Sequence, residues 1–489
     1  MTSGFICDIL GMKICMRILW GKYMRIHEDV ISDMPERASV LPCIGIDIGT
    51  TTISAVVLDA ANGETLDVDT IANASDIPSD FTWEKIQDAE KIAERIRQLL
   101  ESMYNRYAEV KAIGITGQMH GILYVDGAGN VVSPLYTWQD ERAGQGNPSP
   151  CQILEERTGY RIAPGYGLAT HFSNQLNGTV PDNAVKLCTI MDYIVMKFSG
   201  RTCPLMHSSN AASLGFFDTQ SGLFDREAIL RAEMGPALLP DVTAENAVAG
   251  TWNGIPVVVA IGDNQASFLG AVRDPEREAL ANFGTGSQIS VMNHDTSGFR
   301  TDAAMEIRPF IEKSWLTSGS ALCGGRAYAL LERFFRQYVT ACGMSASEQY
   351  EVMNTLARKG METGRYLHVH TTFCGTRNDP TLRGSVEGIS EELLTPEAFI
   401  AGTLWGMAAE LYEMFRKMPH DHVNTLIVSG NAVRKNPALR QMLKKVFEME
   451  VWMPAHKEEA AFGAAMFSAI GSGCADRKSL ADCIRYTDI

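Results

Sequence analysis

The chain's polarity pattern includes two short apolar runs separated by a small polar turn. In CIGIDIGTTTISAVVLD, residues 43–59, isoleucine alternates with glycine and aspartate up to Ile48, and the apolar pattern resumes at Ile53. A period of two residues is typical of a strand with one buried face, so we predict a hairpin over residues 44–59. The carboxylate of Asp47 stands inside the first strand, directly before a turn of small hydroxyl residues, and this position needs an explanation.

Further apolar runs alternate between the period of a strand and the period of a helix. Strand-like runs cover residues 112–126, with a polar break, and 255–263, 279–292 and 422–433. Helical spacing predicts helices over residues 83–107, 186–198, 322–339, 396–418, 437–447 and 458–469, the last rich in small residues that allow close packing. The run IPVVVAIGD, residues 255–263, is typical of a strand buried on both faces. Residues 145–182 are rich in Gly, Pro and Asn and predict loops with short helices.

Three of the apolar strands end in glycine beside a small polar residue. The three turns are Asp47-Ile48-Gly49-Thr50, Phe283-Gly284-Thr285-Gly286 and Val428-Ser429-Gly430-Asn431. The first two lie about half a chain apart, and 489 residues are too many for one ordinary core. We therefore predict two similar α/β halves that face each other across a cleft, with a boundary near residues 273–278.

Composition and charge narrow the range of partners. A net charge of -15 argues against nucleic acid and against an anionic membrane surface, because both are bound through clustered Lys and Arg. No uncharged apolar run reaches the roughly 18 residues of a membrane-spanning helix. The 11 cysteines are scattered without zinc-site spacing, which favours reduced thiols in the cytoplasm. Basic residues interrupt the apolar ones in residues 1–40, which we treat as an N-terminal extension of unknown order.

Small residues at a tight turn let several backbone N–H groups approach a phosphate. The candidate nucleotide-binding residues are Gly49, Thr50, Thr51, Thr52, Gly284, Thr285, Gly286, Gly430 and Asn431. Two such turns can hold the triphosphate of ATP, and Asp47 beside the γ-phosphate then calls for Mg²⁺, bound through water. Ordinary turn chemistry explains a single such motif without any ligand, but three turns in two repeated halves favour the ligand.

Transfer of a phosphoryl group to an alcohol also needs a base and a binding site for the alcohol. Asp263 ends an apolar strand and is the candidate base; the alternative is a cap of the helix that begins near Asn264. Gln118 and His120, in TGQMHG, can bond hydroxyls, although a lone histidine of this kind is more often a satisfied loop residue. TWQDER, residues 137–142, offers Trp138 and Asp140 to a sugar, and the alternative is a surface turn with an Asp/Arg pair.

These motifs together resemble those of a known family. IGIDIGTTT, TGQMHG, TWQDER, GDNQ, GTGS and VSGNAV, in this order, are similar to the motifs of the FGGY carbohydrate kinases, from about Cys43 to Gly473. TWQDER, GYGLATHF, MDYIV and SNAASLGFFDTQSG are most similar to the sedoheptulokinase branch. The xylulokinase branch shares the Gln-Met-His motif but usually has Trp-Asn-Asp where this chain has Trp138-Gln139-Asp140.

The resemblance implies a fold, an activity and a set of roles. The fold is α/β: two actin-like ATPase (ribonuclease H-like) domains, each a mixed five-stranded sheet flanked by helices, with the active site in the interdomain cleft. Residues 41–273 would bind the sugar and residues 274–489 the nucleotide. The activity is transfer of the γ-phosphate of ATP to the terminal primary hydroxyl of a ketose. Sedoheptulose is the first expected substrate and D-xylulose the second. An actin-like ATPase switch that uses no sugar is the alternative from another class.

Family roles carry over to matching positions only. Asp263 resembles the catalytic base and Asp47 the acid near Mg²⁺, while the implied sugar contacts are Gln118, Met119, His120, Trp138, Asp140, Asp263 and Asn264. The chain departs from the pattern at Glu141, where glycine is common, at Gly430-Asn431, where Gly-Gly is usual, and at Lys435, so the adenosine contacts are expected to differ. Residues 294–315 and 340–380 carry no family motif. The motifs do not fix the oligomeric state, for which a homodimer is the working hypothesis.

Overall fold

The computed structural model describes residues 40–107, 109–302, 304–345, 347–377, 379 and 381–487. The chain divides into residues 1–40 and 41–489, and the account below concerns the second part. The prediction of an extension over residues 1–40 falls, apart from Val40, outside the described residues.

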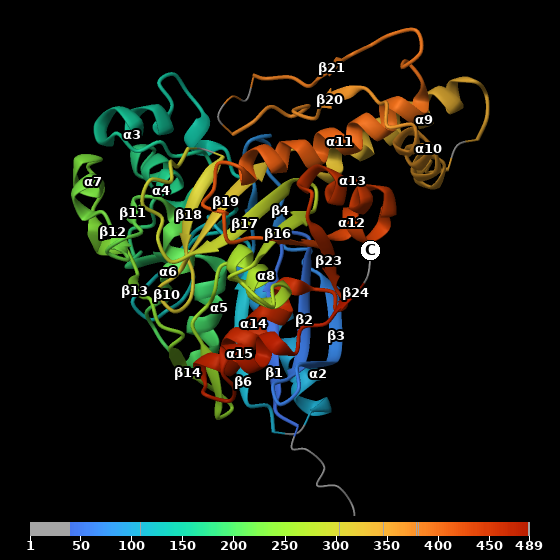
Figure 1. Ribbon diagram of the computed structural model, residues 1–489. Helices are drawn as coiled ribbons and strands as arrows, with labels where there is room; N and C mark the ends of the chain where they lie inside the picture. Colours follow the sequence, from blue (N-terminus) through green and yellow to red (C-terminus); the bar gives the residue numbers. More distant parts are fainter. Residues whose placement is uncertain are drawn as a thin grey trace, which may run out of the picture. The chain divides into compact units, whose positions relative to one another are not determined.

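The hairpin predicted over residues 44–59 is present and forms the centre of the first sheet (Figure 1). The strands lie in the order β14-β15-β6-β1-β2-β3. Strands β1, β2 and β3 are antiparallel neighbours, whereas β1, β6 and β15 run parallel. The bounds are β1 Pro42–Ile48, β2 Thr52–Asp59, β3 Glu64–Ala72, β6 Ala112–Gly117, β14 Val248–Trp252 and β15 Ile255–Val258.

The second sheet repeats this connectivity. Its strands lie in the order β18-β19-β17-β16-β22-β23-β24, with β16, β17 and β19 as antiparallel neighbours and β16, β22 and β23 parallel. The bounds are β16 Glu278–Phe283, β17 Ser287–Asn293, β18 Met305–Pro309, β19 Trp315–Ala321, β22 Thr425–Ser429, β23 Glu450–Pro454 and β24 Tyr486–Thr487. The prediction of two similar α/β halves is therefore confirmed.

Both sheets are wider than the five strands expected. Five positions are shared, and antiparallel partners extend the edges: β14 joins β15 in the first sheet, while β18 joins β19 and β24 joins β23 in the second. The added strands are short returns of the chain that pair exposed edges. The mixed α/β class itself is as predicted.

The long helices flank the two sheets. They are α2 Ala89–Arg106, α5 Ile190–Ser199, α8 Asp263–Ala271, α9 Gly325–Ala341, α10 Tyr350–Glu362, α11 Pro396–Phe415, α13 Pro437–Phe447 and α14 Glu459–Gly471. Shorter helices are α3 Pro150–Thr158, α4 Gly167–Leu176, α6 Ser208–Ala211, α7 Arg226–Arg231, α12 Asn431–Lys435 and α15 Arg477–Asp482. Short strands are β4 Asp76–Ile77, β5 Ile86–Gln87, β7 Leu123–Val125, β8 Leu135–Tyr136, β9 Lys186–Cys188, β10 Leu205–His207, β11 Phe217–Asp218, β12 Leu223–Phe224, β13 Asp241–Thr243, β20 His368–His370 and β21 Ser385–Glu387.

Two predicted helices begin later than the apolar spacing suggested. The helix expected from residue 83 begins at Ala89, because residues 86–87 pair as β5 and the Asp88 side chain caps the helix by accepting from the Lys91 N–H. The helix expected from residue 186 begins at Ile190, after strand β9 and the cap residue Thr189. Polar capping residues set both starts, and hydrophobic periodicity does not detect them.

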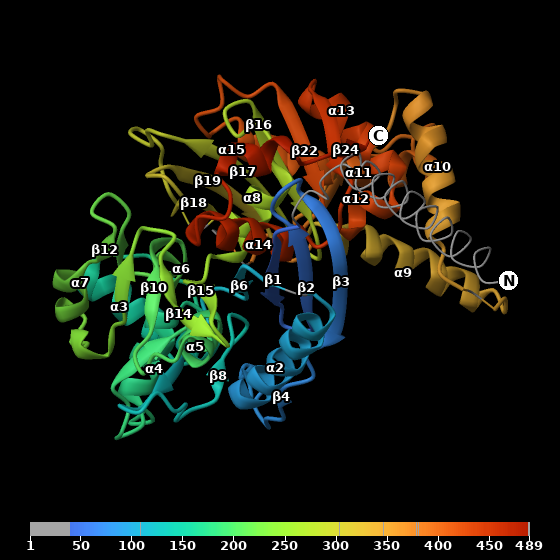
Figure 2. The same cartoon turned by 90° about the horizontal axis from the view of Figure 1, so that it is seen from below.

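Helix α14 packs backbone against backbone, as its small residues predicted. A Cβ atom added to Gly463 would lie 1.8 Å from the Ala266 carbonyl oxygen of α8, and one added to Gly45 would lie 2.0 Å from the Ala461 carbonyl oxygen. In both views α8 and α14 lie between the two sheets (Figures 1 and 2). The hydrophobic cluster of the first sheet includes Phe462 and Phe467. The boundary at residue 273 stays a prediction.

Two negative findings concern the described residues only. Among them, no helix has both the length and the apolar character needed to span a membrane. The nine cysteines in this part of the chain are all free thiols.

Candidate active site

The first phosphate-type turn, between β1 and β2, is held by hydrogen bonds to its carbonyl oxygens. The Asn73 side-chain amide donates to the Gly49 oxygen at 2.8 Å, and the Asn73 backbone N–H donates to the Thr51 oxygen at 2.8 Å. The Gln87 amide donates to the Thr50 oxygen at 2.9 Å. Because two side-chain amides and one backbone N–H fix its three carbonyls, the turn is preorganised.

Two carboxylates that are far apart in the sequence approach each other at the ends of β1 and β15. Asp47 stands on β1, and Asp263 is the first residue of α8; each is partly buried. Burial raises the pKa of Asp47 to about 7, and repulsion from Asp263 and then Glu458 adds to this rise. Burial also raises the pKa of Asp263, while Arg308 and the Asn264 N–H oppose the rise.

Gly262, not Asp263, occupies the cap position of α8. The alternative weighed for Asp263, a helix cap, is therefore limited to its contact with the Asn264 N–H. The ends of two side chains pack closely on Gly262, where an added Cβ would lie 2.6 Å from Gln265 Oε1, 2.9 Å from the methyl carbon of Met119 and 3.0 Å from its sulfur. Met119 thus supports the turn that presents Asp263.

The loop after β6 presents two polar side chains from TGQMHG. Gln118 is 5% exposed, and its amide nitrogen donates to Gln87 Oε1 at 2.9 Å. Its Oε1 atom has no hydrogen-bond partner among the described residues. Gln87 therefore links Gln118 to the Thr50 carbonyl of the phosphate-type turn.

His120 adopts a left-handed backbone conformation with φ of 71°, which is unusual outside glycine and clusters at functional sites. Its Nδ1 atom lies 2.7 Å from the Ser213 carbonyl oxygen, so Nδ1 carries the proton and Nε2 is an acceptor. Burial lowers the pKa of His120 to about 4, so the ring is neutral at neutral pH. The alternative interpretation, a loop histidine with its hydrogen bonds already made, explains the contact of Nδ1 but gives no role to Nε2.

Trp138 and Asp140 differ in their suitability for ligand contact. The Trp138 ring is 44% exposed, and its Nε1–H donates to the Thr50 hydroxyl at 3.0 Å. Asp140 is fully buried; its Oδ1 accepts from Arg142 Nε at 2.7 Å and its Oδ2 from the Lys85 N–H at 3.0 Å. The Asp/Arg pair weighed as the alternative is therefore what Asp140 forms, inside the molecule instead of at its surface. This geometry gives no support to a sugar contact by Asp140, whose carboxylate fixes the loop that carries Trp138.

The second and third turns lie against each other and against the start of α9. The Gly325 N–H donates to the Gly284 carbonyl at 2.9 Å, and the Arg326 N–H donates to the Thr285 carbonyl at 3.1 Å. Gly430 has φ of 94°, and a Cβ there would lie 2.5 Å from the Phe283 carbonyl oxygen. Thr285, Gly286 and Asn431 belong to these same two turns. Gly324 and Gly325 were missed at the sequence level, although a Gly-Gly pair directly before a helical run could have indicated them.

Asn264 connects the two sheets. Its amide nitrogen donates to Gln288 Oε1 at 2.7 Å and to the Ser290 hydroxyl at 3.1 Å, both on β17. The Ser318 hydroxyl of β19 donates to its oxygen at 3.3 Å. Beside this contact is a polar cavity of about 80 Å³, lined by Asp263, Asn264, Ser267, Leu280, Asn282, Gln288 and Ser290. The amide expected to contact substrate is thus engaged with the second sheet.

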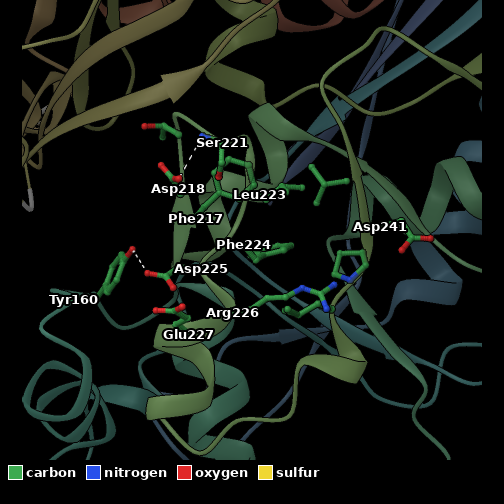
Figure 3. Close-up of a pocket in the computed structure, with 14 residues that line it drawn as sticks. Tyr160, Phe217, Asp218, Ser221, Leu223, Phe224, Asp225, Arg226, Glu227 and Asp241 are labelled. Carbon is green, nitrogen blue, oxygen red and sulfur yellow. Dashed lines mark hydrogen bonds between the residues drawn. The ribbon is translucent and has the colours of Figure 1, made fainter.

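A larger cavity of about 920 Å³ lies between the β11–β12 hairpin, α7 and β13 (Figure 3). Tyr160, Phe224 and Asp225 are among its lining residues, and none of the predicted site residues is. Size alone therefore does not identify the site in this protein.

Fold and site together define an actin-like phosphotransferase, and comparison with known proteins supplies the family. Residues 43–270 match the N-terminal domain of the FGGY family of carbohydrate kinases, and residues 279–472 match its C-terminal domain. The chain therefore belongs to the FGGY family of carbohydrate kinases. It is a sugar kinase, and its family implies that it uses ATP.

Individual relatives carry several different substrate names. The chain is 27% identical to the sedoheptulokinase of Mus musculus over 467 residues, which cover 86% of this chain and 96% of that protein. It is 23% identical to the gluconokinase of Bacillus subtilis (strain 168), with 88% of each chain covered. The crystal structure of xylulose kinase from Rhodospirillum rubrum superposes with a TM-score of 0.78 at 20% identity, covering 91% of this chain and 93% of that one.

Proposed function

We propose that this kinase transfers the γ-phosphate of ATP to the terminal primary hydroxyl of a ketose, and that sedoheptulose, which would give the 7-phosphate, is its substrate. The observation that carries the proposal is the position of Asp263. Met119 belongs to TGQMHG, residues 116–121, which we call the acceptor motif, and it packs against Gly262. Asp47 repels Asp263, and the Asn264 side chain reaches the second sheet. These contacts support the proposal that Asp263 lies between the acceptor hydroxyl on one side and the nucleotide phosphate on the other.

In the proposed mechanism Asp263 accepts the proton of the attacking hydroxyl. Arg308 opposes the rise in the pKa of Asp263 and so keeps more of the carboxylate ionised. Gln118 Oε1 and His120 Nε2 accept hydrogen bonds from other hydroxyls of the sugar. The exposed face of Trp138 lies against the C–H groups of the sugar, while its N–H holds Thr50 in place.

The nucleotide phosphates would lie on the two Gly-Thr turns, whose N–H groups stabilise the charge on the transferred group. The Asp47 carboxylate, which Asp263 repels, fits a magnesium ion bound together with ATP, because Mg²⁺ is usually held by one or two carboxylates and the substrate phosphates. When bound, Mg²⁺ supplies positive charge that offsets the phosphates and Asp47. Gly430 and Asn431 would contact the adenosine part of ATP.

Two features favour a sugar kinase with a ketose substrate. An ATPase switch without a sugar substrate has no use for the unpartnered Gln118 Oε1 and the neutral His120. The sedoheptulokinases of Mus musculus and Homo sapiens, each 27% identical over 86% of this chain, favour sedoheptulose. D-Xylulose is the second candidate, since Staphylococcus xylosus xylulose kinase is also a relative, at 22% identity. Cytoplasmic location and a homodimer stay predictions.

A coupled assay of ADP release tests the proposal. ATP and Mg²⁺ are supplied with sedoheptulose, D-xylulose, L-ribulose, D-ribulose, glycerol or gluconate in turn. We expect sedoheptulose to give the highest kcat/KM, and Asp263→Asn to lower kcat by about 10²- to 10⁴-fold. The exposed Asp421→Asn serves as the control and should leave kcat unchanged.

A higher kcat/KM for another sugar would contradict sedoheptulose as the substrate but leave the proposed phosphoryl transfer unchanged. An Asp263→Asn variant with the wild-type rate would contradict the assignment of Asp263 as the base. A lack of stimulation by every sugar, with ATP still hydrolysed, would favour the ATPase switch.

A further inference from the structure

A buried ionic group reaches the acceptor motif from the second sheet. Glu306 and Arg308 alternate along β18 and so share one face of that strand. The Tyr166 hydroxyl donates to Glu306 Oε1 at 2.6 Å, and Arg308 Nε and Nη2 contact Glu306 Oε2 at 2.8 and 2.7 Å. Arg377 Nη1 lies 3.5 Å from Glu306 Oε1. These four residues form the Glu306 cluster.

The Glu306 cluster adjoins both the acceptor motif and the candidate base. The ring centroids of Tyr166 and His120 lie 4.5 Å apart. Glu306, Arg308 and Arg377 each act electrostatically on His120, and Arg308 also acts on Asp263. The cluster is therefore one wall of the region where the sugar is proposed to bind, although it comes largely from the half assigned to the nucleotide.

The cluster has more donors than its own members use. Burial would raise the pKa of Glu306, but Arg308, His120, Arg377 and Tyr166 together lower it to about 2, so the carboxylate is ionised. Two guanidinium groups thus act on the one carboxylate of the cluster, and Arg308 also acts on the Asp263 carboxylate outside it. The contacts of Arg308 with Glu306 use Nε and Nη2, and the contact of Arg377 uses Nη1, so Arg308 Nη1 and Arg377 Nε and Nη2 are not used within the cluster.

Arg308 is only 7% exposed. Burying a guanidinium group is costly unless its donors are used. A guanidinium group is donor-only, and its planar arrangement of N–H groups suits oxygen acceptors. A bound molecule rich in hydroxyl or carbonyl oxygens would use the donors that the cluster does not use.

We propose that Arg308 determines acceptor specificity by donating hydrogen bonds to an oxygen of the acceptor sugar, and that Glu306 and Tyr166 position its guanidinium group. The inference rests on the proposed sugar kinase activity and adds the residues that choose among acceptors. A purely structural ion pair between the two halves is the competing interpretation, and steady-state kinetics separates the two.

Arg308→Met keeps the aliphatic stem and removes every donor. Loss of a hydrogen bond from a charged donor is expected to raise the KM for the preferred sugar by about 10- to 100-fold, with the KM for ATP within about twofold of wild type. The ratio of kcat/KM between the best and the second-best acceptor should change at least fivefold. A structural role would instead lower stability and move both KM values or neither.

Tyr166→Phe is the milder variant, since it keeps the ring on His120 and removes only the hydroxyl that holds Glu306. We expect about a 3- to 10-fold rise in sugar KM, again without a change for ATP. Tyr160→Phe is the matched control, because it removes a similar tyrosine–carboxylate hydrogen bond, 2.8 Å to Asp225, beside a cavity that none of the predicted site residues lines (Figure 3). It should leave both KM values unchanged.

Calorimetric titration of each folded variant with the sugar measures binding directly, and a thermal melt reports folding. If Arg308→Met fails to fold, Tyr166→Phe decides. Unchanged sugar affinity and unchanged acceptor ratios in the folded variants would overturn the inference while the kinase activity stands. Wild-type protein without sugar-dependent ADP release would overturn the proposed function itself.

Discussion

Replacing Gly463 with alanine tests the contact that holds the candidate base in position. Gly463 of α14 faces the backbone of α8, where an added Cβ would lie 1.8 Å from the Ala266 oxygen and 2.9 Å from the Gly270 nitrogen. Both atoms belong to backbone and cannot rotate away. The two helices must therefore separate by about 1 Å or more, in an interior that is close-packed.

Two opposing effects determine how much the Gly463→Ala substitution lowers the free energy of unfolding. Alanine is better than glycine in a helix by about 1 kcal/mol, while overpacking of this kind costs about 1 to 3 kcal/mol and sometimes more. Because the blocking atoms are backbone, we expect a cost at the upper end of this range and a net destabilisation of about 2 kcal/mol. Because α8 begins with Asp263 and Asn264, its displacement should also lower kcat by about 10-fold or more, since a shift of roughly 1 Å at a reacting group can cost about 10²-fold.

Urea denaturation followed by circular dichroism, together with sugar-dependent ADP release, measures both effects. Gly127→Ala is the control, because no atom lies within 4 Å of a Cβ at that position. The control should keep the wild-type urea midpoint and kcat. A Gly463→Ala variant with a wild-type midpoint and a wild-type kcat would refute the close packing of α8 and α14 and its link to the base.

Two further variants test buried charges. Arg434 of α12 donates to the Pro454 and His456 carbonyls and pairs with Glu459 at the start of α14, with side chains 16% and 12% exposed. Arg434→Met leaves the Glu459 carboxylate buried without its partner and should lower the unfolding free energy by about 3 kcal/mol. Arg416→Met, which breaks the exposed pair with Glu413, is the control and should lower it by less than about 1 kcal/mol. Equal urea midpoints of the two variants would contradict this expectation. Burial raises the pKa of Asp192 from 3.8 to about 7, and hydrogen bonds from Thr189 and Asn210 oppose the rise. The folded state therefore binds the proton more tightly, so this group weakens folding as pH rises from about 4 to 7. Asp192→Asn should gain stability relative to wild type over that window, and a stability difference that does not change with pH would contradict the assignment.

Local chemistry made the phosphate-type turns predictable. Gly49-Thr50 and Gly284-Thr285 follow alternating apolar strands, so a window of a few residues is enough to predict each turn. The buried run predicted a strand over residues 255–263, but β15 ends at Val258 and Asp263 begins α8 instead of ending the strand. In both turns neighbouring residues in the sequence are neighbours in the structure.

Long-range contacts were outside the reach of such patterns. Glu306 and Arg308 sit in a stretch without a motif, and only the pairing of β18 at the sheet edge brings them to Tyr166. Asp140 looked like a sugar ligand because its neighbours include Trp138, yet Arg142 and Lys85 occupy its oxygens. Sequence spacing does not reveal whether a carboxylate is already paired.

The position of the transferred phosphate tests the central claim most directly. Wild-type protein and Asp263→Asn are incubated with ATP, Mg²⁺ and sedoheptulose, and the products are analysed by ³¹P NMR with proton correlation. The account predicts one phosphomonoester on the terminal carbon in wild type, formed in amounts equal to ADP, and a loss of about 10²-fold or more in its rate of formation in Asp263→Asn. Inorganic phosphate as the sole product with every sugar tested, or equal rates in the two proteins, would contradict it.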